Sequence, residues 1–176
     1  CQHRQIQVVV VDAQAGDAVI DAAPKGPRGR ARALDTQPGV LLGSSFEYPG
    51  RYSRYDIGLV NPPLRITCSG ERVELTALHP RGTALLQILS PVVSATGALC
   101  DVHVTEDVVR ARVRPAATPE FEEERSRSAS VFDLLRGLVA HLGHAGDSLL
   151  GLYGAFGYGL GFRFEPVHAR LPQPLG

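Results

Sequence analysis

The sequence predicts an α+β domain in which a mainly antiparallel sheet is covered by helices on one face. Two pairs of segments, 64–69 with 72–78 and 101–105 with 108–113, alternate apolar and polar residues on either side of short turns, which is typical of β-hairpins. Residues 131–142 instead place their apolar side chains at helical spacing. The chain has 176 residues, of which 44% are hydrophobic. This length and composition suit one folded core.

The elements before the first hairpin are a strand, a loop and a second short strand. Residues 6–11 are mostly β-branched and predict a strand. Residues 24–32 combine two prolines, two glycines and four positive charges, which indicates a loop. A nucleic-acid patch is the alternative, but interleaved aromatic residues are missing, so we interpret this segment as a solvated loop. Residues 40–42 again resemble a strand.

The segment 46–58 is the most chemically crowded part of the chain. It holds three tyrosines, one phenylalanine, two arginines and a Pro-Gly turn within thirteen residues. We therefore take it as the first candidate for a binding site. The alternative is that the tyrosine rings close the edge of a core while their hydroxyls face water.

The second half of the chain supplies the remaining elements. Residues 84–89 are apolar and are interpreted as a strand or as the entry to the short segment 90–98. Residues 115–127 form a loop whose three consecutive glutamates we expect to be solvated. A helix then begins after the capping residue Ser130 and ends at Gly143 and Gly146. Its apolar stripe comprises Val131, Leu134, Leu135, Leu138, Val139 and Leu142.

A glycine-rich segment, 151–161, follows the helix and contains five glycines. It is not a phosphate-binding loop, because no Lys-Ser/Thr pair follows it and no strand-turn-helix unit continues from it. We expect a strand over 149–156, with glycines alternating with bulky residues because a neighbouring backbone approaches closely.

Composition excludes several classes of function. The formal net charge is zero, so no charged surface drives binding to nucleic acid or to a membrane. The three cysteines, Cys1, Cys68 and Cys100, form no Cys-x-x-Cys pair and predict no metal site, and reduced thiols suit the cytoplasm. The serines lack the Gly-x-Ser-x-Gly pattern of a nucleophile. Because the chain starts at Cys1 and contains no methionine, we expect it to be part of a longer protein.

Several segments, taken in order, carry a resemblance to a known family. They are Leu41–Ser44 with Gly50–Ser53, then Leu64–Ile66, then Gly151–Tyr158 followed by Phe164 and Glu165. Together they resemble the amino-terminal domain of anthranilate synthase component I. The likeness is greatest to the bacterial form fused to its glutamine amidotransferase, in which Glu47–Tyr52 and Ser126–Phe132 look like family signatures. It extends from about Gly39 to Pro166.

The resemblance implies a site for an effector rather than a catalytic site. In the family, a Leu-Leu-Glu-Ser element and a nearby basic residue form part of the pocket for inhibitory tryptophan. Leu42 and Ser44 match that element, and Arg51 is the candidate basic residue. Gly43 replaces the usual glutamate, and Gly159 replaces the usual aspartate after Gly-Tyr.

The resemblance also implies what the longer protein does. Residues 1–176 would be part of an amino-terminal regulatory and scaffold domain, without the catalytic half that holds the Mg²⁺-binding glutamates. The parent would be a lyase of tryptophan biosynthesis that converts chorismate and glutamine to anthranilate, pyruvate and glutamate. Its partners would be the chorismate-binding half, the glutamine amidotransferase and L-tryptophan, in a cytoplasmic oligomer without nucleic acid or membrane. The chain alone, without a metal or cofactor of its own, is expected to be inactive.

Two alternatives remain open at this point. The parent could be an aminodeoxyisochorismate synthase that serves phenazine formation, or an aminodeoxychorismate synthase, because their amino-terminal domains share this architecture. The chain could also be a stand-alone module that binds a small molecule.

Overall fold

The computed structural model describes residues 5–11, 18–21, 34–42, 56–115, 129–143 and 150–157. In chain order the elements are β1 (Gln5–Val11), β2 (Ala18–Asp21), β3 (Gly39–Leu42), β4 (Asp56–Val60), β5 (Leu64–Ser69), β6 (Arg72–Ala77), α2 (Pro80–Ala95), β7 (Leu99–Val104), β8 (Val108–Val113), α4 (Val131–Leu142) and β9 (Gly151–Phe156). Neither helix among these residues is long and apolar enough to cross a bilayer.

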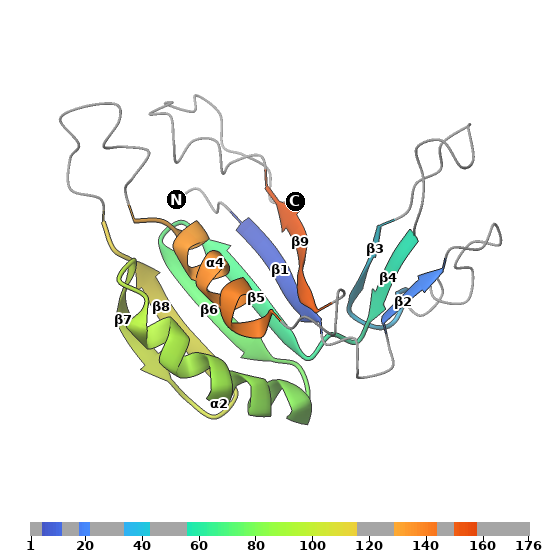
Figure 1. The fold of residues 1–176 in the computed structure, drawn as a ribbon, viewed down its shortest axis with the longest axis horizontal. Coiled ribbons are helices and arrows are strands. Elements are labelled where there is room, and N and C mark those ends of the chain that lie inside the picture. Colours follow the sequence, from blue (N-terminus) through green and yellow to red (C-terminus); the bar gives the residue numbers. More distant parts are fainter. Residues whose placement is uncertain are drawn as a thin grey trace.

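The described strands form two sheets. The larger has the order β7-β8-β6-β5-β1-β9, and every neighbouring pair in it is antiparallel. The smaller has the order β2-β4-β3 and is also antiparallel. Helices α2 and α4 lie on one face of the larger sheet (Figure 1). The predicted α+β class is therefore confirmed.

The first predicted hairpin is β5–β6, and its side chains alternate between the buried and the exposed face of the sheet. Ile66 pairs with Leu75 and Cys68 pairs with Val73, and all four residues are buried under the helices. Gly70 turns the chain with φ +60°, a conformation that favours glycine. The second predicted hairpin is β7–β8, where the pairing is irregular between Cys100 and His103. Both hairpins are confirmed.

Helix α4 begins and packs largely as the sequence predicts. The Asp133 carboxylate accepts a hydrogen bond from the backbone N–H of Ser130 at 2.8 Å, which satisfies a donor at the helix start. Gly143 ends the helix. The buried residues are Val131, Leu134, Leu135 and Leu138. Val139 was predicted to join this stripe, but 48% of it is exposed because it lies on the flank of the helix.

Helix α2 corrects the sequence-based expectation for residues 84–98. These residues were interpreted as a strand or as the entry to a short segment, but most of them form the helix Pro80–Ala95. Its buried residues are Gly82, Leu86, Leu89 and Val93, which recur at helical spacing. The apolar residues in this region form short runs that Gln87 and Ser90 interrupt, and such runs do not by themselves separate a strand from a helix. Pro91 is also a residue type that disfavours the interior of a helix.

The turn between β7 and β8 contacts the start of α2. The helix has no acidic residue in its own first turn. Asp107 supplies one from the turn, because its carboxylate accepts a hydrogen bond from the Thr83 hydroxyl at 2.6 Å. The backbone carbonyl of Asp107 also accepts the N–H of Ala77 at 2.8 Å. The tip of the second hairpin is thereby fixed to the helix and to β6.

One cluster of buried side chains joins both helices to the larger sheet. It comprises Leu64, Ile66, Cys68, Val73, Leu75, Leu86, Leu89, Val93, Leu99, Val109, Ala111, Val113, Val131, Leu134, Leu135 and Leu138. The opposite face of this sheet carries polar side chains, including Arg110 and Arg112. The alternation predicted from the sequence therefore gives one apolar face and one polar face.

Candidate functional site

The predicted effector segment connects β3 to β4. Leu42 is the last residue of β3, and its backbone pairs with Ile57 of β4. Ser44 and Arg51, the other two predicted effector residues, lie outside the described residues. The structure therefore places the start of the segment at the end of a strand.

Strand β3 lies very close to its neighbour at Gly39. A Cβ atom on Gly39 would lie 2.2 Å from the Leu59 carbonyl oxygen and 2.3 Å from Cδ2 of Leu34. Only glycine permits this approach. The N–H of Asn61 also donates to the carbonyl of Pro38 at 2.7 Å. The strand that leads into the effector segment is thus fixed at Gly39 by close packing and at Pro38 by a hydrogen bond.

The link between the two sheets is short and closely packed. Residues 61–63 join β4 to β5, and both prolines in this link are buried. The Pro63 carbonyl accepts the N–H of Leu78 at 2.9 Å. A Cβ atom on Gly82 would lie only 1.9 Å from the same oxygen. The link is therefore packed against the start of α2.

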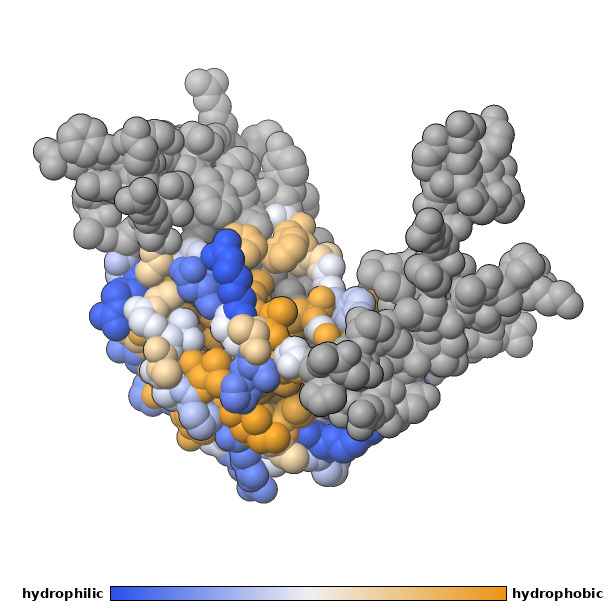
Figure 2. Space-filling model, viewed as in Figure 1, coloured by the Kyte–Doolittle hydropathy of each residue, from blue (hydrophilic) through white to orange (hydrophobic). Residues whose placement is uncertain are grey.

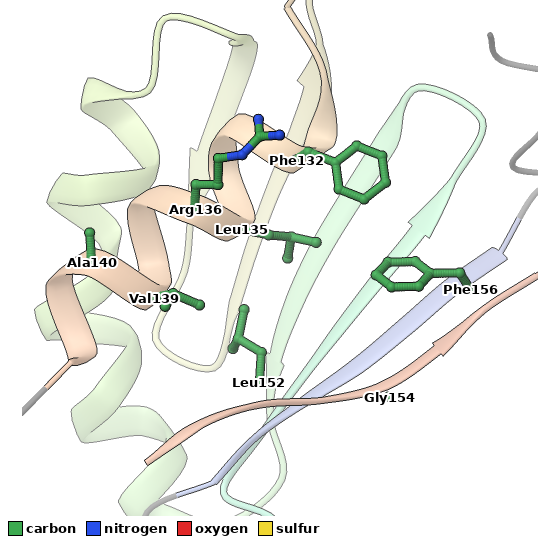
Figure 3. A pocket seen from close by; sticks show the side chains of 8 residues that line it. All are labelled: Phe132, Leu135, Arg136, Val139, Ala140, Leu152, Gly154 and Phe156. Atoms are coloured by element: carbon green, nitrogen blue, oxygen red, sulfur yellow. The ribbon is translucent and has the colours of Figure 1, made fainter. Parts of the chain in front are cut away.

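A second candidate site is an apolar groove between α4 and β9. Its volume is about 470 Å³, and it is lined by Phe132, Leu135, Arg136, Val139, Ala140, Leu152, Gly154 and Phe156. Figure 3 shows Phe132 and Phe156 facing each other across it. Their ring centroids are 5.7 Å apart, with an interplanar angle of 49°. We call this feature the α4–β9 groove.

Strand pairing explains which residues of β9 line the groove. Leu152, Gly154 and Phe156 pair with alternate residues of β1, namely Val10, Val8 and Ile6. Those residues pair in turn with Leu64, Ile66 and Cys68 of β5, which are buried beneath the helices. The three groove residues of β9 therefore belong to the face of the sheet that the helices cover.

The groove offers binding by apolar contact rather than chemistry by charged groups. Arg136 is its one charged lining residue, and its guanidinium lies 3.2 Å from the Asp133 carboxylate in an exposed pair. Within the part of the chain that the structure describes, no group of three or more His, Cys, Asp or Glu could hold a metal ion. His141 is exposed in the last turn of α4, and His144 lies outside the described residues.

The polar face of the larger sheet carries exposed ion pairs. Arg110 lies 2.8 Å from Glu74, and Arg112 lies 2.9 Å from Glu71 and 3.6 Å from Asp101. The hydrogen bond that Arg112 donates to Glu71 and the negative charge of Glu71 raise the pKa of Arg112 above its usual value. These contacts order the surface, but nothing in them resembles a nucleophile with its base.

The groove was not predicted from the sequence. The helical spacing placed Val139 in the packed stripe of α4, and the glycine pattern predicted only a close backbone approach at Gly154. A signal was nevertheless present, because Phe132 and Val139 are seven residues apart on one helix flank and 152, 154 and 156 share a strand face. The pairing of β9 with β1 was needed to bring the two flanks together.

Comparison with known proteins identifies the relatives of this chain. It is 41% identical over 143 residues to an anthranilate synthase from Azospirillum brasilense. It is 31% identical over 127 residues to anthranilate synthase component 1 from Haemophilus influenzae. It is also 31% identical over 134 residues to a component 1 from Pseudomonas aeruginosa that is named as pyocyanine specific. The chain is related to anthranilate synthase component I.

The relationship covers most of this chain and a minor part of each relative. The matches span 81%, 72% and 73% of this chain, but only 19%, 24% and 24% of the three relatives. This chain thus spans about a fifth to a quarter of the curated anthranilate synthases it matches. No family model matches it. No solved structure matches it either.

Proposed function

We propose that this chain is the amino-terminal regulatory part of an anthranilate synthase. The observation that carries the proposal is the match to anthranilate synthases over 72–81% of this chain. The parent enzyme would convert chorismate and glutamine to anthranilate, pyruvate and glutamate in tryptophan biosynthesis. Residues 1–176 would form part of its amino-terminal domain and would serve regulation and scaffolding.

The proposed regulatory site is the segment between β3 and β4. Leu42 would line an apolar wall for the indole ring of tryptophan, Ser44 would hydrogen-bond the polar end of the ligand, and Arg51 would meet its carboxylate. The close approach at Gly39 supports this placement, because it fixes the strand from which the segment starts. A ligand held there would act on strands of defined position.

The catalytic groups would come from the rest of the parent. Such chemistry depends on preorganised metal and acid-base groups. Mg²⁺ would be bound in the catalytic half, since the described residues of this chain offer no cluster of carboxylates for it. The chorismate-binding half and the glutamine amidotransferase would be the partners of this chain, in an oligomeric cytoplasmic enzyme.

A related enzyme with another product is the second candidate. The Pseudomonas aeruginosa relative is named as pyocyanine specific, so chains similar to this one also occur in enzymes with a different role. That observation favours, as the alternative, a parent that serves phenazine formation through aminodeoxyisochorismate.

The decisive experiment compares two serine variants of the parent enzyme. Ser44→Ala should weaken inhibition by tryptophan while uninhibited formation of anthranilate stays nearly unchanged. Allosteric coupling is typically about 1–3 kcal/mol, and a lost polar contact can remove much of it. Ser45→Ala is the control, and it should leave the inhibition curve in place. An unaltered curve for Ser44→Ala would remove this residue from the site.

A second measurement tests whether the catalytic groups lie outside this chain, in the rest of the parent enzyme. The purified 176-residue chain should form no anthranilate from chorismate, with either glutamine or ammonia and with Mg²⁺ present. Fluorescence of anthranilate above background would show that this chain carries catalytic groups. A parent that does not respond to tryptophan would favour the alternative that serves phenazine formation.

A further inference from the structure

The α4–β9 groove exposes large apolar side chains on the helical side of the larger sheet. Phe156 is 56% exposed and Val139 is 48% exposed, and both line the groove. Figure 2 shows apolar surface, in orange, over the helical side of the molecule. Large apolar groups gathered in one groove indicate a binding surface. The chemistry of the lining residues indicates which class of molecule fits this surface.

Two aromatic rings form one wall of the groove. The ring centroids of Phe132 and Phe156 are 5.7 Å apart and the rings are tilted by 49°, which is within the usual range for aromatic pairs. Gly154 lies between Leu152 and Phe156 on the same face of β9 and has no side chain, so a flat ring can approach the strand there. Aromatic side chains beside an open stretch of backbone are suited to contact with another planar ring.

One positive charge lies at the rim of the groove. Arg136 follows Phe132 by four residues, so both side chains lie on the same flank of α4. Its guanidinium lies 3.2 Å from one carboxylate oxygen of Asp133, and the other oxygen accepts the N–H of Ser130 at 2.8 Å. The Arg136 side chain is 76% exposed, and a guanidinium has five N–H donors, so Arg136 can bind an anion while it keeps this contact. Among the lining residues, all of which the structure describes, none carries a carboxylate that would repel an anion.

We propose that the α4–β9 groove binds a small aromatic compound that carries one anionic group. Its ring would contact Phe132 and Phe156 over Gly154, and its anionic group would meet the guanidinium of Arg136. The groove volume of about 470 Å³ lies within the range of about 300–1,000 Å³ that is typical of small-molecule sites. Such sites combine apolar walls with few polar groups. None of the lining residues belongs to the segment between β3 and β4, so this site is separate from the proposed tryptophan site.

Two probes with the same ring system and different charge test the proposal. Naphthalene-2-sulfonate is an anion, and naphthalene-2-sulfonamide is uncharged at neutral pH. Each is titrated into the ¹⁵N-labelled 176-residue chain while the backbone amides are followed by NMR. The sulfonate should shift amides of 135–140 and 152–156 in a saturable manner, with a dissociation constant of about 0.1–1 mM. The sulfonamide should bind at the same amides about threefold to fivefold more weakly, because it lacks the ion pair with Arg136.

Three variants locate the ring and the charge. Gly154→Leu fills the space above β9 and should weaken the binding of both probes at least about tenfold. Ala155→Leu is the matched control, because Ala155 pairs with Gln7 and lies on the opposite face of the strand. This control should leave both dissociation constants within about twofold of those of the parent chain. Arg136→Gln, at an exposed position, should remove the preference for the sulfonate and leave the affinity for the sulfonamide unchanged.

Several results would overturn the proposal. They are the absence of saturable shifts at 135–140 and 152–156 below about 10 mM sulfonate, equal affinity of the parent chain for the two probes, and equal weakening by the two leucine variants. A second copy of the chain is the competing occupant. If the same amides shifted with protein concentration alone and Gly154→Leu removed that shift, the groove would be an interface between copies and the proposal would be wrong.

Discussion

Replacing Gly82 by alanine tests whether the start of α2 depends on its contact with the link between the sheets. Gly82 lies in the first turn of α2 and is buried. A Cβ atom there would lie 1.9 Å from the Pro63 carbonyl oxygen and 3.1 Å from the Ala77 Cα. Real Cβ atoms essentially never approach a heavy atom closer than 3.0 Å. The backbone of the helix or of the link must therefore move by roughly 1 Å.

The expected effect is a net loss of stability. Overpacking of this kind costs about 1–3 kcal/mol, and weakening the hydrogen bond from Leu78 to Pro63 adds about 1 kcal/mol. Alanine has a better helix propensity than glycine, which returns at most about 1 kcal/mol. Gly82→Ala should therefore lower the free energy of unfolding by about 2 kcal/mol.

Gly137→Ala is the matched control in the other helix. A Cβ atom at that position would meet only Cγ1 of Val92, at the ordinary contact distance of 3.8 Å. Helix propensity then dominates, and the variant should gain about 0.5–1 kcal/mol. Urea unfolding followed by circular dichroism compares the two variants with the parent chain. If Gly82→Ala were as stable as the parent chain, the link would not be packed against the helix as described.

Three further predictions concern other parts of the fold, and the first two are measured by urea unfolding and the third by hydrogen exchange. Leu138→Ala, at a fully buried position of α4, should cost about 2–5 kcal/mol, whereas Val139→Ala on the exposed flank should cost below about 1 kcal/mol; equal losses would contradict the assigned helix face. Asp107→Ala should lower the free energy of unfolding by about 1 kcal/mol, because the start of α2 loses its acidic partner. The control Glu106→Ala, at the exposed neighbouring residue, should leave the free energy of unfolding nearly unchanged. Gly39→Ala should reduce hydrogen-exchange protection in β3 and β4, since its Cβ would overlap backbone; unchanged protection would refute the close approach.

The hairpins and α4 could be predicted because local pattern and tertiary packing agree there. The alternation in 64–69 and 72–78 is the alternation that the buried face requires, and Gly70 marks the turn. Helix α2 could not be predicted in the same way. Its helical spacing competes with short apolar runs that also suit a strand and with Pro91, and packing on the sheet decides in favour of the helix.

The candidate sites were predictable to different degrees. Leu42, Ser44 and Arg51 were predicted from a resemblance in short sequence segments. Their role in binding an effector stays a prediction. The short strands β2 and β4 were not predicted, because four or five residues give too little pattern to separate a strand from a loop. The groove depends on the pairing of β9 with β1, which joins residues about 145 apart in sequence.

The link between β4 and β5 connects the proposed regulatory segment to the core. A ligand bound between β3 and β4 can bias the rest of the enzyme only if it favours one of two arrangements of a connected element. The buried prolines 62 and 63, the Leu78 hydrogen bond and the contact at Gly82 make this link a packed connection to α2. A loosely tethered sheet would absorb ligand-induced movement locally. The packing at Pro63 instead favours transmission to α2, and through its buried face to the larger sheet.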